Sequence, residues 1–164
     1  MAVQRFYRLL KHHVSNAGIA RRVRNVTILI VRGPHYSDDP WGGELATTFE
    51  SLVRGAGQVL SVCACSGLRE LVAQVRAVRA KDTRFVLLDP GDLAEEARKH
   101  PEAGLDDALG ELASPYVEVH DDSGAALQRS DGRHAAPLAT IIINGDLAAS
   151  YRIALGIALR RLAE

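Results

Sequence analysis

The chain has 164 residues, a length that suits a single globular domain. Basic and acidic residues are balanced at 20 each, so no overall field attracts nucleic acid or an anionic membrane. The longest apolar runs, at 26–31 and 139–143, have strand length and fall short of the roughly 20 residues of a membrane-spanning helix. No signal-type apolar stretch follows Met1. We therefore expect a cytoplasmic protein whose partner is a small molecule or another copy of the chain.

Residues 1–24 form a basic arm that contains no carboxylate. Its cationic residues are Arg5, Arg8, Lys11, Arg21, Arg22 and Arg24. Apolar residues including Phe6, Leu9, Leu10 and Val14 recur near helical spacing, which predicts an amphipathic helix. Because the remaining residues are net acidic, we expect the arm to dock on its own domain or on a neighbouring subunit. Contact with a membrane or RNA is the alternative.

Strand-like and helix-like segments alternate after the arm. The expected strands are 26–32, 58–64, 84–89, 115–120 and 138–144, and the expected helices are 43–56, 67–80, 94–112 and 147–163. Such alternation predicts a three-layer α/β/α domain with a five-stranded parallel sheet over residues 25–164. Ligands of such sheets bind beyond the carboxyl ends of the strands. The loops 32–43, 89–96 and 120–134 are therefore the candidate site, with the polar segment 121–136 as a lid.

Two kinds of cofactor site are not expected. The segment after the first strand lacks the second and third glycines of a dinucleotide loop, so we expect no nucleotide cofactor. Cys63 and Cys65 share one face of the second strand without further soft ligands nearby, and we expect them to be buried packing thiols. A metal site built from the histidines and aspartates of the loops has no local motif spacing, and we expect no metal.

Four segments, in this order, are similar to those of a known family. They are Ile-Val-Arg-Gly-Pro at 30–34, Leu-Asp-Pro-Gly at 88–91, Pro-Tyr-Val-Glu-Val-His at 115–120 and Ser-Tyr-Arg-Ile-Ala-Leu at 150–155. Together they resemble the type II 3-dehydroquinate dehydratases over roughly residues 25–163. The resemblance implies a flavodoxin-like fold, trimers assembled into dodecamers, and acid–base catalysis without a cofactor.

Several catalytic positions of that family carry other residues here. Trp41 stands where the family has its catalytic tyrosine, and an indole cannot accept a proton at any useful pH. Tyr36 offers a phenol from an earlier position in the same loop. Glu95 replaces a histidine of the protonation machinery, and a glutamate of raised pKa can still transfer protons. The alternative for Glu95 is a first-turn helix carboxylate, favoured by the helix dipole.

Glu118 and His120 match the family best. They are two residues apart in one strand, so both turn to the same face, where the carboxylate can orient the imidazole or raise its pKa. His120 is the leading candidate, and His35, at a family asparagine, is second. The expected catalytic residues are His120, Glu118, Glu95, His35 and Tyr36.

The expected contacts of the substrate and of the oligomer also follow the resemblance. The substrate-binding candidates are Asp89, Gly91, Trp41, Asp122, Ser123, Arg129 and Arg133. Aspartates where the family binds a carboxylate predict repulsion of an anion, so we expect a neutral or cationic substrate. Asp107 matches an aspartate that reaches across the family's trimer interface. Tyr151 and Arg152, at the start of the last helix, are expected to be structural.

Three functions are consistent with these residues. The first is a divergent enzyme that performs cofactor-independent elimination, enolisation or cyclisation on a small neutral or cationic molecule. The second is a genuine 3-dehydroquinate dehydratase with an altered base. The third is a non-catalytic oligomeric binding or scaffold protein, suggested by the joint loss of the family's tyrosine and arginine.

Overall fold

The computed structural model describes residues 27–36, 41–122 and 136–164, and the basic arm at 1–24 lies outside them. The five strands are β1 (Ile28–Arg32), β2 (Leu60–Ala64), β3 (Phe85–Asp89), β4 (Tyr116–His120) and β5 (Ala139–Ile142). All neighbouring strands are parallel, and their order is β2-β1-β3-β4-β5. The predicted flavodoxin-like sheet is therefore confirmed, and each strand lies within its predicted range.

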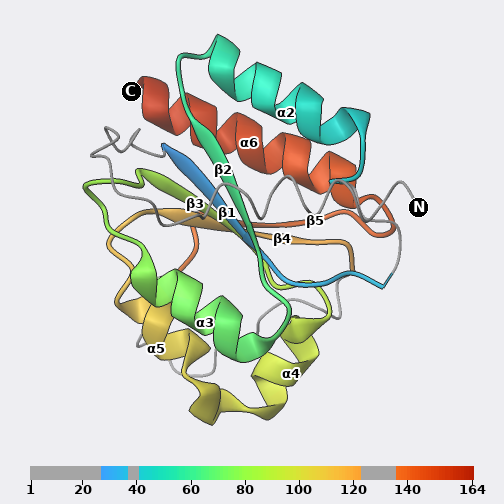
Figure 1. The fold of residues 1–164 in the computed structure, drawn as a ribbon, viewed down its shortest axis with the longest axis vertical. Coiled ribbons are helices and arrows are strands. Elements are labelled where there is room, and N and C mark those ends of the chain that lie inside the picture. The colour runs from blue at the N-terminus through green and yellow to red at the C-terminus, as the bar shows by residue number, and fades with distance from the viewer. Residues whose placement is uncertain (1–26, 37–40, 123–135) are drawn as a thin grey trace, which may run out of the picture.

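Helices cover both faces of the sheet (Figure 1). The helices are α2 (Glu44–Gly55), α3 (Leu68–Ala77), α4 (Leu93–Lys99), α5 (Leu105–Gly110) and α6 (Leu147–Ala163). The pair α2 and α6 lies on one face, whereas α3, α4 and α5 lie on the other. None of the described helices is long and apolar enough to cross a membrane.

One predicted helix, 94–112, is wrong as a single element. It consists of α4 and α5, joined by a short 3-10 turn at Pro101–Ala103. Pro101 has no backbone N–H to continue the α-helical ladder. Gly104 then adopts a left-handed conformation with φ of 82°, which terminates the turn and starts α5 in a new direction.

The alternation of side chains along each strand divides the interior into two apolar cores. Phe85 and Leu87 of β3 pack into the core under α2 and α6, whereas Val86 and Leu88 pack into the core under α3 and α5. By the same alternation, Asp89 continues the row that faces α2 and α6. The central strand β3 is buried along its whole length, as expected for the middle of a covered parallel sheet.

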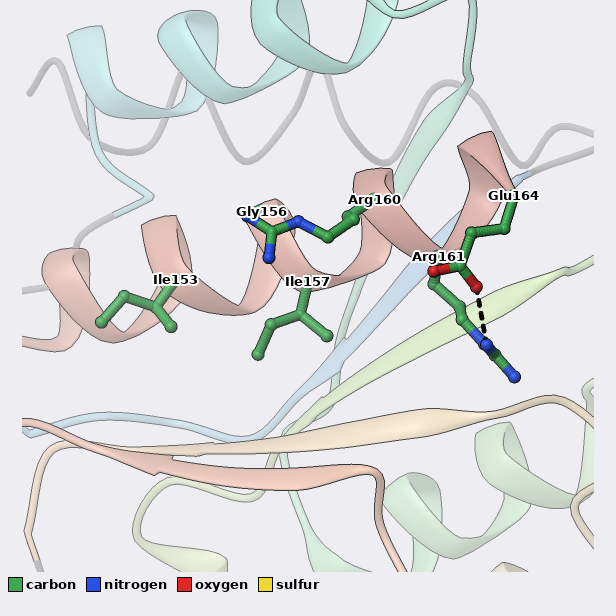
Figure 2. Close-up of a pocket in the computed structure, with 6 residues that line it drawn as sticks. All are labelled: Ile153, Gly156, Ile157, Arg160, Arg161 and Glu164. Atoms are coloured by element: carbon green, nitrogen blue, oxygen red, sulfur yellow. Dashed lines mark hydrogen bonds and ion pairs between the residues drawn. The ribbon is translucent and has the colours of Figure 1, made fainter.

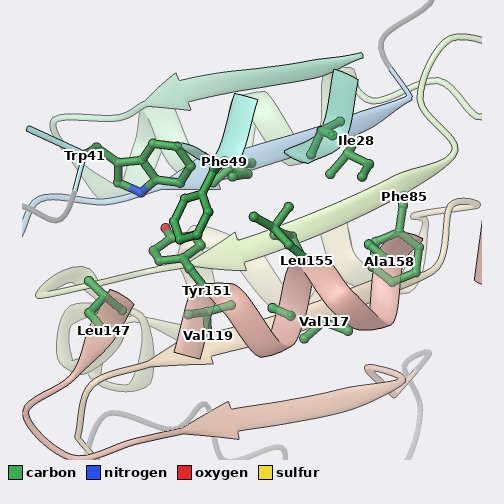
Figure 3. Packing of buried hydrophobic residues seen from close by; sticks show 14 residues of the cluster. Ile28, Trp41, Phe49, Phe85, Val117, Val119, Leu147, Tyr151, Leu155 and Ala158 are labelled. Carbon is green, nitrogen blue, oxygen red and sulfur yellow. The ribbon is translucent and has the colours of Figure 1, made fainter. Parts of the chain in front are cut away.

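Three aromatic rings close the core beneath α6 at the end nearest the loops (Figure 3). Trp41 lies edge-on to Tyr151 with ring centroids 5.0 Å apart, and its ring centroid is 5.5 Å from that of Phe49. The helix that carries Tyr151 starts at the N-cap Asp146, whose side chain accepts a hydrogen bond from the backbone of Ala149. The start of α6 therefore holds the Tyr151 ring against the sheet.

Candidate active site

The loops after β1 and β3 are bonded to each other at the carboxyl end of the sheet. The backbone N–H of Gly33 donates to the carbonyl of Asp89 at 2.7 Å, and that of Asp92 donates to the carbonyl of Pro34 at 2.9 Å. A Cβ atom on Gly33 would lie 2.1 Å from the carbonyl oxygen of Pro90, which no real contact allows. Glycine at this position lets the two loops approach, and this approach brings His35 over the end of β3.

Asp89 is the centre of a buried polar cluster. Nε2 of His35 donates to both carboxylate oxygens of Asp89, at 2.8 and 2.9 Å, and the Tyr151 hydroxyl donates to Oδ2 at 2.5 Å. The backbone N–H of Gly91 donates to Oδ1 at 3.1 Å. Asp89 itself is fully buried. A buried carboxylate is stable only when donors surround it, and this one has donors from three separate elements.

The cluster sets the protonation of its members. Burial lowers the pKa of His35, but the hydrogen bond to Asp89 and the Asp89 charge outweigh burial, so the pKa is raised above its ordinary value of 6.5. Burial, with the Asp89 charge, raises the pKa of Tyr151 well above its usual value, so this phenol stays a neutral donor. The charge of Arg32, which lies across from Asp89 in the sheet register, opposes both shifts.

A hollow of about 300 Å³ lies beside this cluster. Its lining residues are Arg32, Gly33, Pro34, His35, Ala64, Cys65 and Ser66, from the carboxyl ends of β1 and β2. Nδ1 of His35 is 3.9 Å from Oδ2 of Asp121, which follows β4. His35 therefore holds Asp89 with Nε2 and can exchange a proton through Nδ1, the arrangement of a general acid or base.

A larger hollow, of about 540 Å³, lies elsewhere. It follows one face of α6 and is lined by Ile153, Gly156, Ile157, Arg160, Arg161 and Glu164 (Figure 2). Its charged groups include Arg161 and Glu164, which form an ion pair with each other at 2.7 Å. None of the candidate catalytic residues lines it, so the smaller hollow beside His35 is the better candidate site.

Glu118 and His120 form a second buried pair. Nε2 of His120 is 3.4 Å from Oε2 of Glu118, a distance at the long end of hydrogen bonding. Tyr116, Glu118 and His120 alternate along β4, so their side chains share one face of the sheet. Tyr116 packs under α3 and α5, which is the face opposite Asp89. The carbonyl of His120 accepts a hydrogen bond from Ser150 at 3.0 Å. The expected shared face of Glu118 and His120 is present, but these contacts do not join them to the His35 cluster.

Three sequence candidates do not reach the hollow, which corrects our expectation for each. The Glu95 side chain is 65% exposed on α4, where its carboxylate pairs with Lys99, and this pair lowers its pKa. This position agrees with the alternative expectation for Glu95, a carboxylate in the first turn of a helix. Tyr36 is 93% exposed, and its backbone N–H donates to Oδ2 of Asp92 at 2.8 Å. Trp41 is buried in the apolar core, since its indole fills the space between Phe49 and Tyr151.

The remaining candidates occupy varied places. Gly91 has a positive φ of 55° and borders Pro34 and His35, so it shapes the loop around the cluster. Asp122 and Asp107 are exposed, the first after β4 and the second on α5. Ser123, Arg129 and Arg133 lie outside the described residues. Over 27–36, 41–122 and 136–164, no group of three or more His, Cys, Asp or Glu side chains could hold a metal ion.

Sequence reasoning missed two residues of the candidate site, Arg32 and Tyr151. Arg32 ends an otherwise apolar central strand and lies directly across from Asp89 in the sheet register. A charge at the carboxyl end of a buried strand was the available signal. Tyr151 was assigned a structural role only. The signal was that Tyr151 lies on the same face of its helix as Leu147, Leu155 and Ala158. Its hydroxyl group is therefore inside the core, where a buried phenol needs a hydrogen-bond partner.

The amino-acid sequence is similar to those of known enzymes. Over 142 residues the chain is 28% identical to a 3-dehydroquinate dehydratase from Stutzerimonas stutzeri (strain A1501), covering 85% of this chain and 92% of that protein. It is 29% identical over 141 residues to one from Xanthomonas euvesicatoria pv. vesicatoria (strain 85-10), covering 84% and 90%. The chain is a divergent relative of the 3-dehydroquinate dehydratases. No model of a protein family matches it.

Two solved structures of type II dehydroquinases align with the fold of this chain. The type II dehydroquinase from Propionibacterium acnes aligns with a TM-score of 0.59 at 21% identity, covering 82% of this chain and 98% of that one. The type II dehydroquinase from Butyrivibrio crossotus DSM 2876 aligns with a TM-score of 0.54 at 16% identity, covering 82% and 97%. These similarities show a shared flavodoxin-like fold.

Proposed function

We propose that the protein is a dehydroquinase-like enzyme that performs cofactor-independent acid–base chemistry on a small molecule. The reaction class is elimination of water, enolisation or cyclisation. The observation that carries the proposal is the His35–Asp89 pair, held by Tyr151 beside a hollow at the carboxyl end of the sheet. Similarity to 3-dehydroquinate dehydratases supports the same class of chemistry.

In this proposal His35 is the acid and base. Its Nε2–H stays on Asp89, so the neutral ring presents the lone pair of Nδ1 toward the substrate. Nδ1 takes a proton from the carbon next to a carbonyl group, and the Asp89 charge stabilises the imidazolium that forms. The C–O bond at the neighbouring carbon breaks as Nδ1–H returns its proton to the departing hydroxide, which leaves as water. Such proton transfer contributes about 10²- to 10⁴-fold to a rate.

Asp89 acts through His35 in this scheme and does not touch the substrate. Its two carboxylate oxygens are occupied by donors from His35, Tyr151 and Gly91. Near the hollow, Arg32 is a cationic group, Asp89 and Asp121 are anionic groups, and His35 passes between its neutral and cationic forms during the proposed reaction. This balance favours a neutral substrate, such as a hydroxylated cyclic ketone, within the neutral or cationic range that the sequence predicts.

The main alternative is dehydroquinate itself. It is supported by the names of the curated relatives, and the Arg32 charge near His35 offers a group that can offset nearby carboxylates. It is disfavoured by Trp41, which lies in the core at the position of the family's tyrosine. The third possibility, a non-catalytic binding or scaffold protein, gives no role to the His35–Asp89 pair beside the hollow.

One assay series tests these functions. Purified protein is incubated with polyols, amines, cyclic ketones and 3-dehydroquinate, and conjugated products are followed by ultraviolet absorbance. For any substrate turned over, His35→Gln lowers kcat/KM by about 10²-fold or more. The matched control is Glu95→Gln, which removes an exposed carboxylate and leaves the rate unchanged. Turnover of dehydroquinate alone supports the alternative. An activity that survives His35→Gln, or no turnover of any compound, rejects the proposed catalytic role.

We further propose that the chain self-associates as a trimer or dodecamer in the cytoplasm. Asp107 is exposed on α5, as an interface residue of an isolated subunit must be. Light scattering of the full chain measures the oligomer size. Asp107→Ala shifts the distribution toward smaller species if this residue crosses the interface, and an unchanged distribution rejects that role.

A further inference from the structure

The reaction proposed for His35 creates negative charge on a second atom of the substrate. When a base removes a proton from the carbon next to a carbonyl group, the electron pair moves onto the carbonyl oxygen, which becomes an enolate oxygen. Hydrogen-bond donors and cations aimed at such an oxygen usually make the largest single contribution to catalysis. A site for this reaction therefore needs a cation or a donor that borders the same hollow as the base.

Arg32 lies on the same face of the sheet as Asp89 and borders the hollow. Along β1 it continues the row of Ile28 and Ile30, which pack into the core under α2 and α6. Asp89 continues the corresponding row on β3, and the sheet register pairs it directly with Arg32. Nε2 of His35 lies 2.8 Å from Oδ2 of the same Asp89. Arg32 on the neighbouring strand and His35 in the following loop therefore flank one carboxylate, and both line the hollow.

Several other donors around the hollow are already used within the protein. The backbone N–H groups of Gly33 and Cys65 each donate to a backbone carbonyl at 2.7 Å. The backbone N–H and the hydroxyl of Ser66 both donate to Oε2 of Glu70, at 2.8 and 2.9 Å. Among the described residues that line the hollow, Arg32 is the one whose side chain carries a permanent positive charge. Its guanidinium is therefore the best candidate for a group that meets an enolate oxygen.

The burial of Arg32 suits this role. The residue is only 5% exposed, and a cation attracts an anion more strongly where water is excluded. A guanidinium carries five N–H donors, so Arg32 can donate to a substrate oxygen in addition to its interactions within the protein. Besides burial, the Arg32 charge is what lowers the pKa of His35, in agreement with a short separation between the two side chains.

We propose that Arg32 is a catalytic residue that binds the carbonyl oxygen of the substrate and stabilises the enolate oxygen formed when His35 removes a proton. This inference rests on the proposed acid–base function and narrows its substrates to compounds with a carbonyl group. The substrate lies with its carbonyl oxygen at Arg32 and its acidic carbon at Nδ1 of His35. Amines and polyols that lack a carbonyl group are then excluded as substrates.

The step is balanced without an oxidant or a reductant. The C–H bond breaks, its proton moves to Nδ1 of His35, and its electron pair forms a C=C bond. The π electrons of the carbonyl group move to the oxygen, which accepts hydrogen bonds from Arg32. In an elimination, the C=O bond then forms again, the C–O bond at the neighbouring carbon breaks, and the proton on Nδ1 leaves with the hydroxyl group as water.

A phenol tests this role without knowledge of the substrate, because a phenolate has the planar, delocalised oxygen anion of an enolate. The probe is p-cyanophenol, and its ionisation in the presence of the full chain is followed by ultraviolet absorbance. We expect the bound phenol to ionise at a pH about one unit or more below that of the free phenol. Arg32→Gln should weaken phenolate binding about ten-fold or more. A wild-type chain that binds no phenol, or only the neutral phenol, overturns the proposal.

Matched ligands and variants separate Arg32 from His35. Benzonitrile has the same ring and nitrile group without the hydroxyl, so Arg32→Gln should leave its affinity unchanged. Arg32→Lys keeps the charge but not the planar donors, and its phenolate affinity should lie between those of the wild type and Arg32→Gln. His35→Gln should keep the preference for phenolate. If His35→Gln loses this preference while Arg32→Gln keeps it, His35 is the oxyanion-binding group and the proposal is overturned.

An NMR titration tests the position of the guanidinium without any ligand. Arg32→Gln removes a charge that lowers the pKa of His35, so this pKa should rise, whereas Arg32→Lys should leave it close to the wild-type value. The control is Arg69→Gln, which removes an exposed charge on α3 and should cause no change. An unchanged His35 pKa in Arg32→Gln overturns the proposal. Fluorescence of Trp41, the single tryptophan, confirms that each variant is folded, and the wild-type phenol titration decides the case even where a variant is not.

This inference and the proposed function fail in different ways. For any ketone that is turned over, Arg32→Gln should lower kcat by about 10²- to 10³-fold. Turnover that Arg32→Gln leaves unchanged rejects the role of Arg32, while the role of His35 stands. Absence of turnover, with phenolate binding that depends on Arg32, rejects the enzymatic function but retains Arg32 as an oxyanion-binding group.

Discussion

The hydroxyl of Tyr151 donates a hydrogen bond of 2.5 Å to Oδ2 of Asp89, and both residues are completely buried. This bond connects the first turns of α6 to the end of the central strand β3. It also completes the donor set that keeps a carboxylate stable under an apolar core. Asp89 in turn holds His35, so the position of the proposed catalytic histidine depends on a residue from the other end of the chain.

Removal of the Tyr151 hydroxyl should destabilise the fold. Tyr151→Phe keeps the ring against Trp41 and Phe49 but leaves Asp89 with one donor fewer, and we expect a loss of about 1.5–3 kcal/mol in the free energy of unfolding. Urea unfolding followed by Trp41 fluorescence measures it. Tyr36→Phe is the control, because its exposed phenol should change stability by less than about 0.5 kcal/mol. Equal losses in the two variants would contradict a specific bond to Asp89.

Replacement of Asp89 should lower the pKa of His35. In Asp89→Asn the charge that raises the pKa is gone while burial remains, so the pKa should fall below the ordinary value of 6.5. An NMR titration of the imidazole protons measures this directly. Asp121→Asn should lower the pKa by less, because Asp121 is the smallest contributor to the shift. A larger fall in the Asp121 variant would show that a different carboxylate controls His35.

The raised pKa of His35 makes stability depend on pH. The folded chain binds a proton at His35 more tightly than the unfolded chain, so protonation stabilises the fold. This contribution is fully present below the unfolded value of about 6.5 and is lost as pH rises through the higher folded pKa. Unfolding free energies measured from pH 5 to 9 should fall across this window in the wild type. His35→Gln should flatten that fall, and an unchanged slope would exclude His35 as its source.

The fold was predictable because its signals are local. The strands β1 and β3 are short, almost uninterrupted apolar runs, and the helices between them begin and end near glycines and charged residues. The mistaken helix 94–112 has the same origin. Its apolar spacing continues through Pro101 and Gly104, and the 3-10 turn at Pro101–Ala103 together with the left-handed Gly104 separates α4 from α5.

The site was less predictable because it depends on which face of each strand a residue occupies. Alternation correctly gave Glu118 and His120 a common face, but sequence alone did not show that Asp89 uses the opposite face. Resemblance to the family led to Glu95 by alignment, whereas the described residue is an exposed partner of Lys99. Tyr151 was overlooked because its contact with Asp89 spans 62 positions of the chain.

The close approach of the β1 and β3 loops offers a last prediction. Gly33→Ala places a Cβ atom 2.1 Å from the carbonyl oxygen of Pro90, and the backbone must move to relieve the clash. We expect a loss of about 1–3 kcal/mol in stability, together with a fall in the pKa of His35 as its loop moves away from Asp89.

Gly67→Ala is the matched control for this change. Its backbone is extended, with φ of −159°, and a Cβ atom there meets nothing within 4 Å. Gly67 is the N-cap of α3, where alanine is less favourable than glycine, so stability should fall by up to about 1 kcal/mol, whereas the His35 titration should stay as in the wild type. Urea unfolding and NMR titration of both variants make the comparison. If Gly33→Ala behaves like Gly67→Ala, the contact between the two loops is not what holds His35 on Asp89.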